Sequence, residues 1–196
     1  MKGVIIACLL LLEMGEGQPN PPLSLQPTPL EAFAHMPATH IAWSKEVGRI
    51  DSREAHAVVT ALILEDTAQP PDRMRGIRIH LSAKDFEDTV YLGEETLGAY
   101  KKALDEIATE AAQERSKGTT RDNLTRQGTS YVGTDVFWYA TKAPRVHSLN
   151  AAYYFAADSS GLYLSAFQPK GFRFPDEDPS KLSLAICRAM EQLRNN

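Results

Sequence analysis

Five histidines offer the side chain most often used to bind metals or to move protons near neutral pH. They are His35, His40, His56, His80 and His147. Metal-binding pairs on a helix are commonly four residues apart, so that both rings lie on one face. The two nearest histidines here are five residues apart with Pro37 between them, and the others are scattered along the chain. The spacing therefore predicts no metal site.

An acidic run near the end of the chain, Asp176-Glu177-Asp178, offers carboxylates to a cation such as calcium. A calcium loop needs oxygen ligands at alternating positions and a glycine at its sharp turn, and this run has neither. Asp178 is followed by Pro179, which is the pattern of a helix cap and a first helical residue. We therefore expect no metal and no other cofactor, and a helix that begins at Pro179.

Signals for covalent catalysis are also weak. Residues 128–133 (GTSYVG) are one residue longer than the Gly-x-Ser-x-Gly motif of a nucleophile elbow. They also lead into an expected strand, whereas a nucleophile elbow comes directly after a strand. The sequence has no Ser-x-x-Lys, His-Glu-x-x-His or glycine-rich phosphate loop. A catalytic site would have to assemble in space, and His56, His80 and Asp135 would be its candidates. The sequence thus predicts no catalytic residue and favours a protein that is not an enzyme.

Aromatic side chains are concentrated in residues 119–196, which hold 11 of the 16. Some occupy both faces of an expected strand, as where Tyr163 and Phe167 alternate with leucine and alanine. A second apolar face needs a cover, which could be segment 30–50, a second subunit or a ligand. We expect protein to cover it. If a ligand binds there instead, its contact residues are expected to be Trp138, Tyr154, Tyr163 and Phe167.

The charge distribution argues against nucleic acid as the ligand. Residues 50–118 carry 9 basic and 14 acidic side chains, a net charge of −5, and residues 119–196 carry 9 and 7, a net charge of +2. Phosphate binding needs a clear basic patch, and the whole chain is acidic with a formal charge of −4. Binding of single-stranded nucleic acid through the aromatic face is therefore only an alternative.

The first 17 residues have the pattern of a secretory signal peptide. Lys2 precedes an apolar run over residues 3–12 that is too short to span a bilayer, and two glycines stand just before a cleavage point at Gln18. Acidic residues are unusual in a cleavage region, which leaves a buried N-terminal helix or strand as the alternative. We expect removal of residues 1–17, a secreted or periplasmic location, and no membrane span in the mature chain.

Residues 18–49 are expected to form a proline-rich tether and a short helix. Five prolines between residues 18 and 29 favour an extended chain. Thr28-Pro29-Leu30-Glu31 then combines a capping hydroxyl, a proline at the first helical position and an acid in the first turn. This pattern predicts a helix over 29–36 that Pro37 stops.

Two runs of strands, each followed by a helix, define the expected fold. In the first half, residues 55–65, 77–81 and 89–92 read as strands, and the apolar positions then take helical spacing over 94–115. In the second half, strands are expected at 131–141, 149–157 and 162–167, before the helix that begins at Pro179. We interpret residues 50–118 and 119–196 as two β-β-β-α pseudo-repeats of one domain, residues 50–196. The predicted class is α+β, a mostly antiparallel sheet with both helices on one face.

In element order alone, this arrangement resembles the repeated strand-and-helix units of the Whirly and PUR nucleic-acid-binding families, which have four strands before each helix. Their sequence motifs do not occur here, so the resemblance implies no function. The sequence as a whole favours an exported, non-enzymatic binding protein. Its expected partner is another protein, an envelope component or a second copy of the chain.

Overall fold

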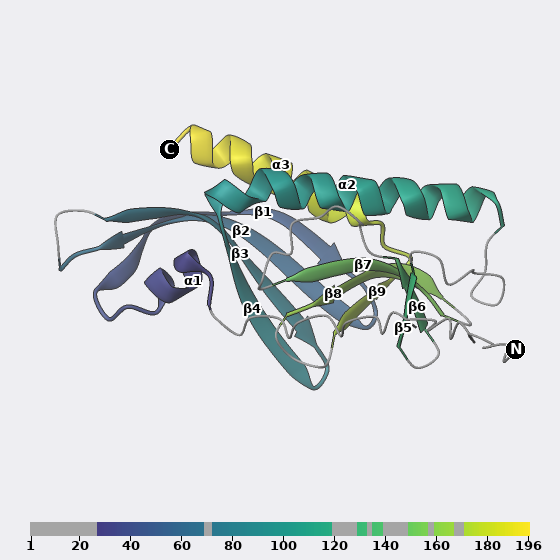
Figure 1. The fold of residues 1–196 in the computed structure, drawn as a ribbon. Coiled ribbons are helices and arrows are strands. Elements are labelled where there is room, and N and C mark those ends of the chain that lie inside the picture. Colours follow the sequence, from purple (N-terminus) through teal and green to yellow (C-terminus); the bar gives the residue numbers. More distant parts are fainter. Residues whose placement is uncertain are drawn as a thin grey trace, which may run out of the picture.

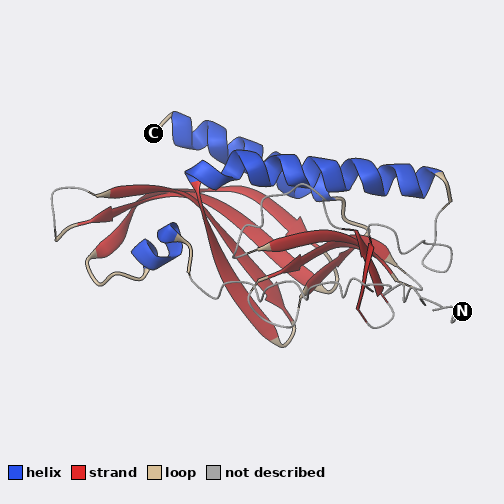
Figure 2. Ribbon diagram, in the orientation of Figure 1, coloured by secondary structure: helices blue, strands red, loops and turns tan. Residues whose placement is uncertain are grey.

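The strands and helices of this protein occur in separate runs along the chain (Figures 1 and 2). The computed structural model describes residues 27–68, 72–118, 129–132, 135–138, 149–156, 159–166 and 171–196. These residues form two antiparallel sheets and three helices, which confirms the α+β class predicted from the sequence. The expected signal peptide, residues 1–17, lies outside the described residues.

The first sheet contains four strands in chain order, each antiparallel to the next. They are β1 (Thr39–Asp51), β2 (Ala55–Asp66), β3 (Arg73–Ala83) and β4 (Phe86–Gly93). Side chains alternate between the two faces of a strand. In β3, Ile77, Ile79 and Leu81 are fully buried on one face, whereas Arg78 and His80 are half-buried on the other. We call these the inner and the outer face of the first sheet.

Strand β1 is an addition to the sequence-based assignment, which places residues 18–49 in the tether and the short helix. Its register against β2 shifts between Ile41 and Trp43 and again between Glu46 and Gly48. Each shift breaks the two-residue alternation on which strand detection depends. Most of its side chains are also exposed or only half-buried, as expected of an edge strand. This segment is therefore a strand because it pairs with β2, and its local sequence pattern alone does not predict one.

The two long helices lie side by side over the inner face and run in opposite directions (Figure 1). In α2 (Glu94–Ser116), Leu97, Leu104 and Ile107 are buried, which confirms the predicted apolar stripe. Helix α3 (Pro179–Arg194) begins as predicted, because the Asp178 side chain accepts a hydrogen bond from the backbone N–H of Ser180 at 2.9 Å. No helix in the described part of the chain is long and apolar enough to cross a membrane.

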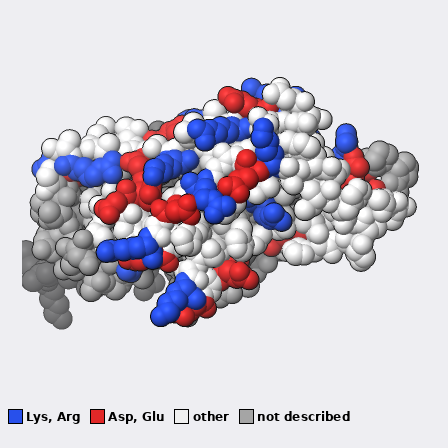
Figure 3. All heavy atoms as spheres, turned by 180° about the vertical axis from the view of Figure 1, so that it is seen from behind, with Lys and Arg blue, Asp and Glu red and all other residues white. Residues whose placement is uncertain are grey.

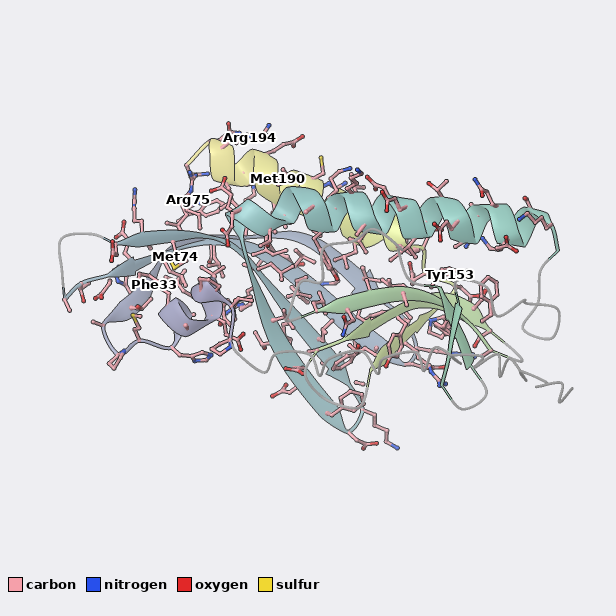
Figure 4. The ribbon with its side chains drawn as sticks, viewed as in Figure 1. Phe33, Met74, Arg75, Tyr153, Met190 and Arg194 are labelled. Atoms are coloured by element: carbon pink, nitrogen blue, oxygen red, sulfur yellow. The ribbon has the colours of Figure 1, made fainter. Side chains whose placement is uncertain are left out.

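Helix α1 (Pro29–Ala34) packs on the outer face, on the opposite side of the first sheet from α2 and α3 (Figure 1). Its buried side chains, Leu30 and Phe33, contact apolar residues of β2 and β3. Figure 4 shows Phe33 close to Met74, one of these residues. Because its sheet contacts fall at one end of β2 and β3, α1 leaves the rest of the outer face uncovered.

The second sheet contains five strands, again in chain order and antiparallel. They are β5 (Thr129–Val132), β6 (Asp135–Trp138), β7 (Asn150–Phe155), β8 (Ser160–Ser165) and β9 (Phe172–Pro175). Strand β9 is also absent from the sequence-based assignment. It has only four residues and ends in proline, so it is too short to show a period of its own.

A single buried cluster joins the two sheets and the two long helices. Leu162, Leu164 and Phe174 of the second sheet belong to the same cluster as the inner face of the first. The rings of Phe86 and Phe172 meet across the junction, with centroids 4.6 Å apart. The predicted strands therefore divide between two sheets that share a core. In the described part of the chain, four strands precede α2 and five lie between α2 and α3, and the internal pseudo-repeat stays a prediction.

Candidate functional site

Three of the four aromatic residues predicted to contact a ligand, Trp138, Tyr154 and Tyr163, belong to strands of the second sheet, and the structure describes the side chains of two of them. Tyr154 in β7 and Tyr163 in β8 lie on the same face of adjacent strands. Tyr154 is 0 % exposed, and the guanidinium of Arg173 lies 5.8 Å from the centre of its ring. The side chain of Trp138 and the whole of Phe167 lie outside the described residues. A ring with no exposed surface contributes to packing and presents nothing to a ligand in this conformation.

A groove of about 720 Å³ opens on the outer face of the first sheet. Small-molecule sites commonly have volumes of roughly 300–1,000 Å³, so the groove has a suitable size. Its lining comes from three adjacent strands and from the end of α1. The lining residues are His35, Val58, Thr60, Arg78, His80, Glu87, Asp88, Thr89 and Tyr91.

His35, the residue just after α1, forms one wall of the groove, and side-chain contacts fix the position of the helix. The Thr28 hydroxyl accepts a hydrogen bond from the first turn of the helix at 3.1 Å and donates one to the carbonyl of Tyr91 at 2.9 Å. Leu30 is fully buried over Gly76, where a Cβ would lie 2.6 Å from Leu30 Cδ2. Glycine at this position therefore allows α1 to pack close to the sheet. His35, just after the helix, meets the Tyr91 ring edge-on with centroids 6.2 Å apart.

His80 stands on the floor of the groove between a hydroxyl and a carboxylate. Its Nδ1 lies 3.2 Å from Thr89 Oγ1, directly across the strand pair, and its Nε2 lies 3.9 Å from Glu87 Oε2. The first distance is that of a hydrogen bond and the second is too long for one. Thr60, which is 8 % exposed, adds a further hydroxyl. The floor can therefore both donate and accept hydrogen bonds.

Arg78 is the one lining residue that carries a permanent positive charge. It is half-buried, and its direct cross-strand neighbours on the outer face are both neutral, namely Thr60 on β2 and Tyr91 on β4. Glu46, which faces Thr60 from β1, is already paired with Arg49 at 3.3 Å. Within the described residues, no carboxylate forms an ion pair with Arg78. Among the described lining residues, Arg78 is thus a single permanent cation whose charge no ion pair compensates.

The three residues considered for catalysis are not brought together. His80 lines the groove, and His56 lies on the same outer face but pairs through Nδ1 with Asp51 at 2.8 Å. Asp135 belongs to β6 in the other sheet. In the described part of the chain, no group of three or more His, Cys, Asp or Glu side chains is arranged to hold a metal ion.

A second polar cluster connects α2 with the second sheet and with α3, and its geometry indicates a structural role. Arg115 donates one hydrogen bond to the Tyr153 hydroxyl at 2.9 Å and another to Asp178 at 2.8 Å. Figure 4 places Tyr153 toward the C-terminal end of α2. Burial raises the pKa of Asp178, but hydrogen bonds from Arg115 and Ser180 outweigh burial and hold this pKa below its ordinary value. These groups satisfy one another and leave no site for a ligand.

Charged side chains are intermingled on the face of the molecule seen in Figure 3, where Lys and Arg lie among Asp and Glu. The described ion pairs agree with this mixture, for example Arg49 with Glu46 and Arg53 with Glu54. Affinity for a nucleic-acid backbone depends on several clustered cations that bind phosphates. This face does not offer such a cluster.

The sequence contained one signal for the groove, although the site itself was missed. The alternation of Ile77 and Ile79 with Arg78 and His80 is typical of a strand with one face in water. That pattern indicates an outer face but not its shape. His35, which follows α1 and lies about 40 residues earlier in the chain, adds the wall that the strand pattern does not predict.

No family model matches the sequence, and no curated protein or solved structure matches it either. The fold and the site therefore define an α+β protein with an open polar groove. Its function has to be argued from the residues of that groove.

Proposed function

We propose that the protein is an exported, non-enzymatic binding protein and that its ligand is a small molecule held between α1 and the outer face of the first sheet. The observation that carries the proposal is the groove of about 720 Å³ on a sheet face that the two long helices leave open. Ligand sites typically combine a preformed concavity with a few polar groups that orient the ligand. Here Thr60, His80 and Thr89 are such groups.

A small molecule fits the described surface better than a large apolar partner does. Three large apolar side chains are exposed in the described residues: Met36, Ile41 and Leu184. The first two lie close to α1, and the third lies on α3 on the opposite side of the first sheet. Scattered apolar residues of this kind are normal on a monomer. Binding to another protein, to an envelope component or to a second copy stays a prediction.

The proposal is tested by blocking the groove. Val58→Trp places a large ring on the groove floor, and His56→Trp is the matched control, because His56 lies two residues away on the same strand and face but outside the lining. Ligand-observed NMR would measure binding of benzoate, benzyl alcohol, benzylamine and glycine. We expect at least one compound to bind the wild type and the control but not Val58→Trp. Binding that survives this substitution would place the site elsewhere.

Export is tested independently of the ligand. The support for export is the pattern of Lys2, a short apolar run and small residues before Gln18. The intact mass of the protein recovered from its native host should correspond to a chain that begins at Gln18. A chain that retains Met1 would contradict the proposed secreted or periplasmic location.

The surroundings of His80 favour a second candidate, an enzyme that uses Thr89 as a nucleophile. A hydroxyl beside an imidazole that a carboxylate orients is the pattern of nucleophilic catalysis. The 3.9 Å between His80 Nε2 and Glu87 Oε2 is longer than an orienting hydrogen bond, so this candidate ranks second. Hydrolysis of p-nitrophenyl acetate by the wild type, compared with Thr89→Val, tests it. A rate that depends on Thr89 would favour the enzyme.

A further inference from the structure

The groove also points to the chemistry of what it binds. We infer that the ligand is a small organic anion with a flat apolar body, and that Arg78 holds its charged group. This inference rests on the proposed function, because it takes the groove as the binding site.

The first support is the state of Arg78. It is half-buried, and the side chains directly across from it on both neighbouring strands are uncharged. Buried or partly buried charges in proteins are normally paired, because water no longer fully compensates them. The guanidinium presents a planar fork of N–H donors that matches a carboxylate with two parallel hydrogen bonds. An oxyanion in the groove would supply the missing partner.

The second support is the set of apolar surfaces around Arg78. Tyr91 faces it directly from β4, and the ring of His35 stands edge-on to Tyr91. Val58 lies on the other side, diagonal to Arg78 on β2. Tyr91 and Val58 therefore offer apolar surface on either side of Arg78 to the ring of a ligand. Aromatic rings contribute large contact area with few rotatable bonds.

Two carboxylates also line the groove, but they lie toward its other end. Glu87 is four residues from Tyr91 along β4, which corresponds to about 13 Å at the rise of an extended strand. Asp88 is three residues away, or about 10 Å, and accepts a hydrogen bond from the backbone N–H of Thr89. The residues that face Arg78 directly from the two neighbouring strands are Thr60 and Tyr91, so neither acid stands opposite its guanidinium.

Three probes of similar shape separate the contribution of charge from that of shape. Benzoate is an anion, benzyl alcohol is neutral and benzylamine is a cation, and all three carry the same ring. We expect the wild type to bind benzoate most tightly, with an affinity that falls as sodium chloride rises from about 50 to 300 mM. Isothermal titration calorimetry or ligand-observed NMR would measure the three dissociation constants.

Substitution of the anchor provides the second measurement. Arg78→Gln keeps a long polar side chain but removes the charge, and we expect about a tenfold or larger loss in benzoate affinity with little change for benzyl alcohol. The matched control is Arg49→Gln, because Arg49 is an exposed arginine on the outer face that is already paired with Glu46. This control should bind benzoate as the wild type does.

The outcomes separate this inference from the proposed function. If benzyl alcohol or benzylamine binds as tightly as benzoate, and Val58→Trp still abolishes that binding, the groove is a site but its ligand is not an anion. If none of the probes binds at millimolar concentration, both proposals are wrong. If Arg78→Gln does not fold, the salt dependence of benzoate binding to the wild type still tests the role of Arg78. A benzoate affinity that does not change with salt would overturn that role.

Discussion

On each sheet, the outer face is the one that does not contribute to the shared core, and the outer faces of the two sheets differ in composition and in exposure. On the second sheet, this face carries Ala152 and Tyr154, both 0 % exposed, with Tyr163 partly buried beside them. On the first sheet, it carries Arg78, His80 and other polar groups around an open groove. Of these two outer faces, the one that carries Tyr154 is closed around this ring, whereas the polar one lines an open groove.

This difference shows why aromatic content alone is a poor guide to a binding surface. Burial of a large aromatic side chain is favourable, so an aromatic face is usually covered by whatever part of the protein can reach it. A polar face gains little from being covered and stays accessible unless its groups find partners. The residues that can contact a ligand are therefore mainly polar ones, because burying them would not stabilise the fold.

The largest expected effect tests the closed face. Replacing the fully buried Tyr154 with alanine should lower the free energy of unfolding by about 3 to 5 kcal/mol, the usual cost of removing a buried aromatic ring. Tyr163→Ala is the matched control, since Tyr163 lies on the same face but is only partly buried, and it should cost less. Urea denaturation measures both. An unchanged midpoint for Tyr154→Ala would mean that this face is open in solution.

The next effect tests the inner face that the helices cover. Leu104→Ala in α2 removes a side chain with 0 % exposure and should cost about 2 to 5 kcal/mol. Lys101 and Lys102 lie off the buried stripe, and Lys102→Ala should change the free energy of unfolding by no more than about 0.5 kcal/mol. Equal costs for Leu104→Ala and Lys102→Ala, measured by chemical denaturation, would show that the helix faces the sheet differently.

The third effect tests the wall of the groove. Gly76→Ala adds a Cβ that collides with Leu30 of α1 and lies even closer to the carbonyl oxygen of Leu92, so we expect a cost of about 1 to 3 kcal/mol. Gly98→Ala is the control, because a Cβ there meets nothing within 4 Å and alanine favours the helix. The control should stabilise the protein by roughly 0.5 to 1 kcal/mol. The midpoint temperature of thermal unfolding should therefore fall for Gly76→Ala and rise for Gly98→Ala.

A smaller effect concerns the junction between the helices and the second sheet, and it depends on pH. The folded-state pKa of Asp178 lies below its ordinary value of 3.8, so its pairing with Arg115 stabilises the protein above about pH 4. This stabilisation is lost as the pH falls through the folded-state pKa. Asp178→Asn keeps a helix cap but loses the ion pair, and should cost roughly 0.5 kcal/mol at pH 7 for so exposed a pair.

The measurement is the difference in free energy of unfolding between the wild type and Asp178→Asn as a function of pH. It should shrink toward zero below pH 4. Arg115→Gln also removes the ion pair, so its cost should decline with pH in the same way. If the difference in free energy of unfolding stays constant from pH 7 to pH 3, the charge of Asp178 does not stabilise the protein.

The smallest effect on stability is expected at the open face. Arg78→Gln should change the free energy of unfolding by less than about 0.5 kcal/mol, because Arg78 has no charged partner to lose in the described structure. A large loss of stability would mean that Arg78 makes folding interactions of its own. Arg78 would then be part of the packed structure and would not be available to a ligand on an open face.

Local signals in the sequence determined the helices and the central strands of the first sheet, whereas the single strand predicted over 131–141 spans parts of two strands, β5 and β6. Capping side chains and first-turn prolines placed the start of α1 and of α3, because a cap acts within three residues of the helix end. Helical spacing likewise placed α2 and its buried stripe. The continuous apolar run of β2 and the alternation in β3 sufficed for those strands.

Tertiary contacts decided the rest. Strands β1 and β9 form because they pair with neighbours, since bulges in β1 and the shortness of β9 hide any pattern of their own. The sequence also could not show that the strands divide into two sheets. A hydrogen bond that holds the start of α1 against β4 joins Thr28 to Tyr91, which are 63 residues apart. Periodicity and capping report only on near neighbours in the chain, whereas a binding face is made by residues that meet only after folding.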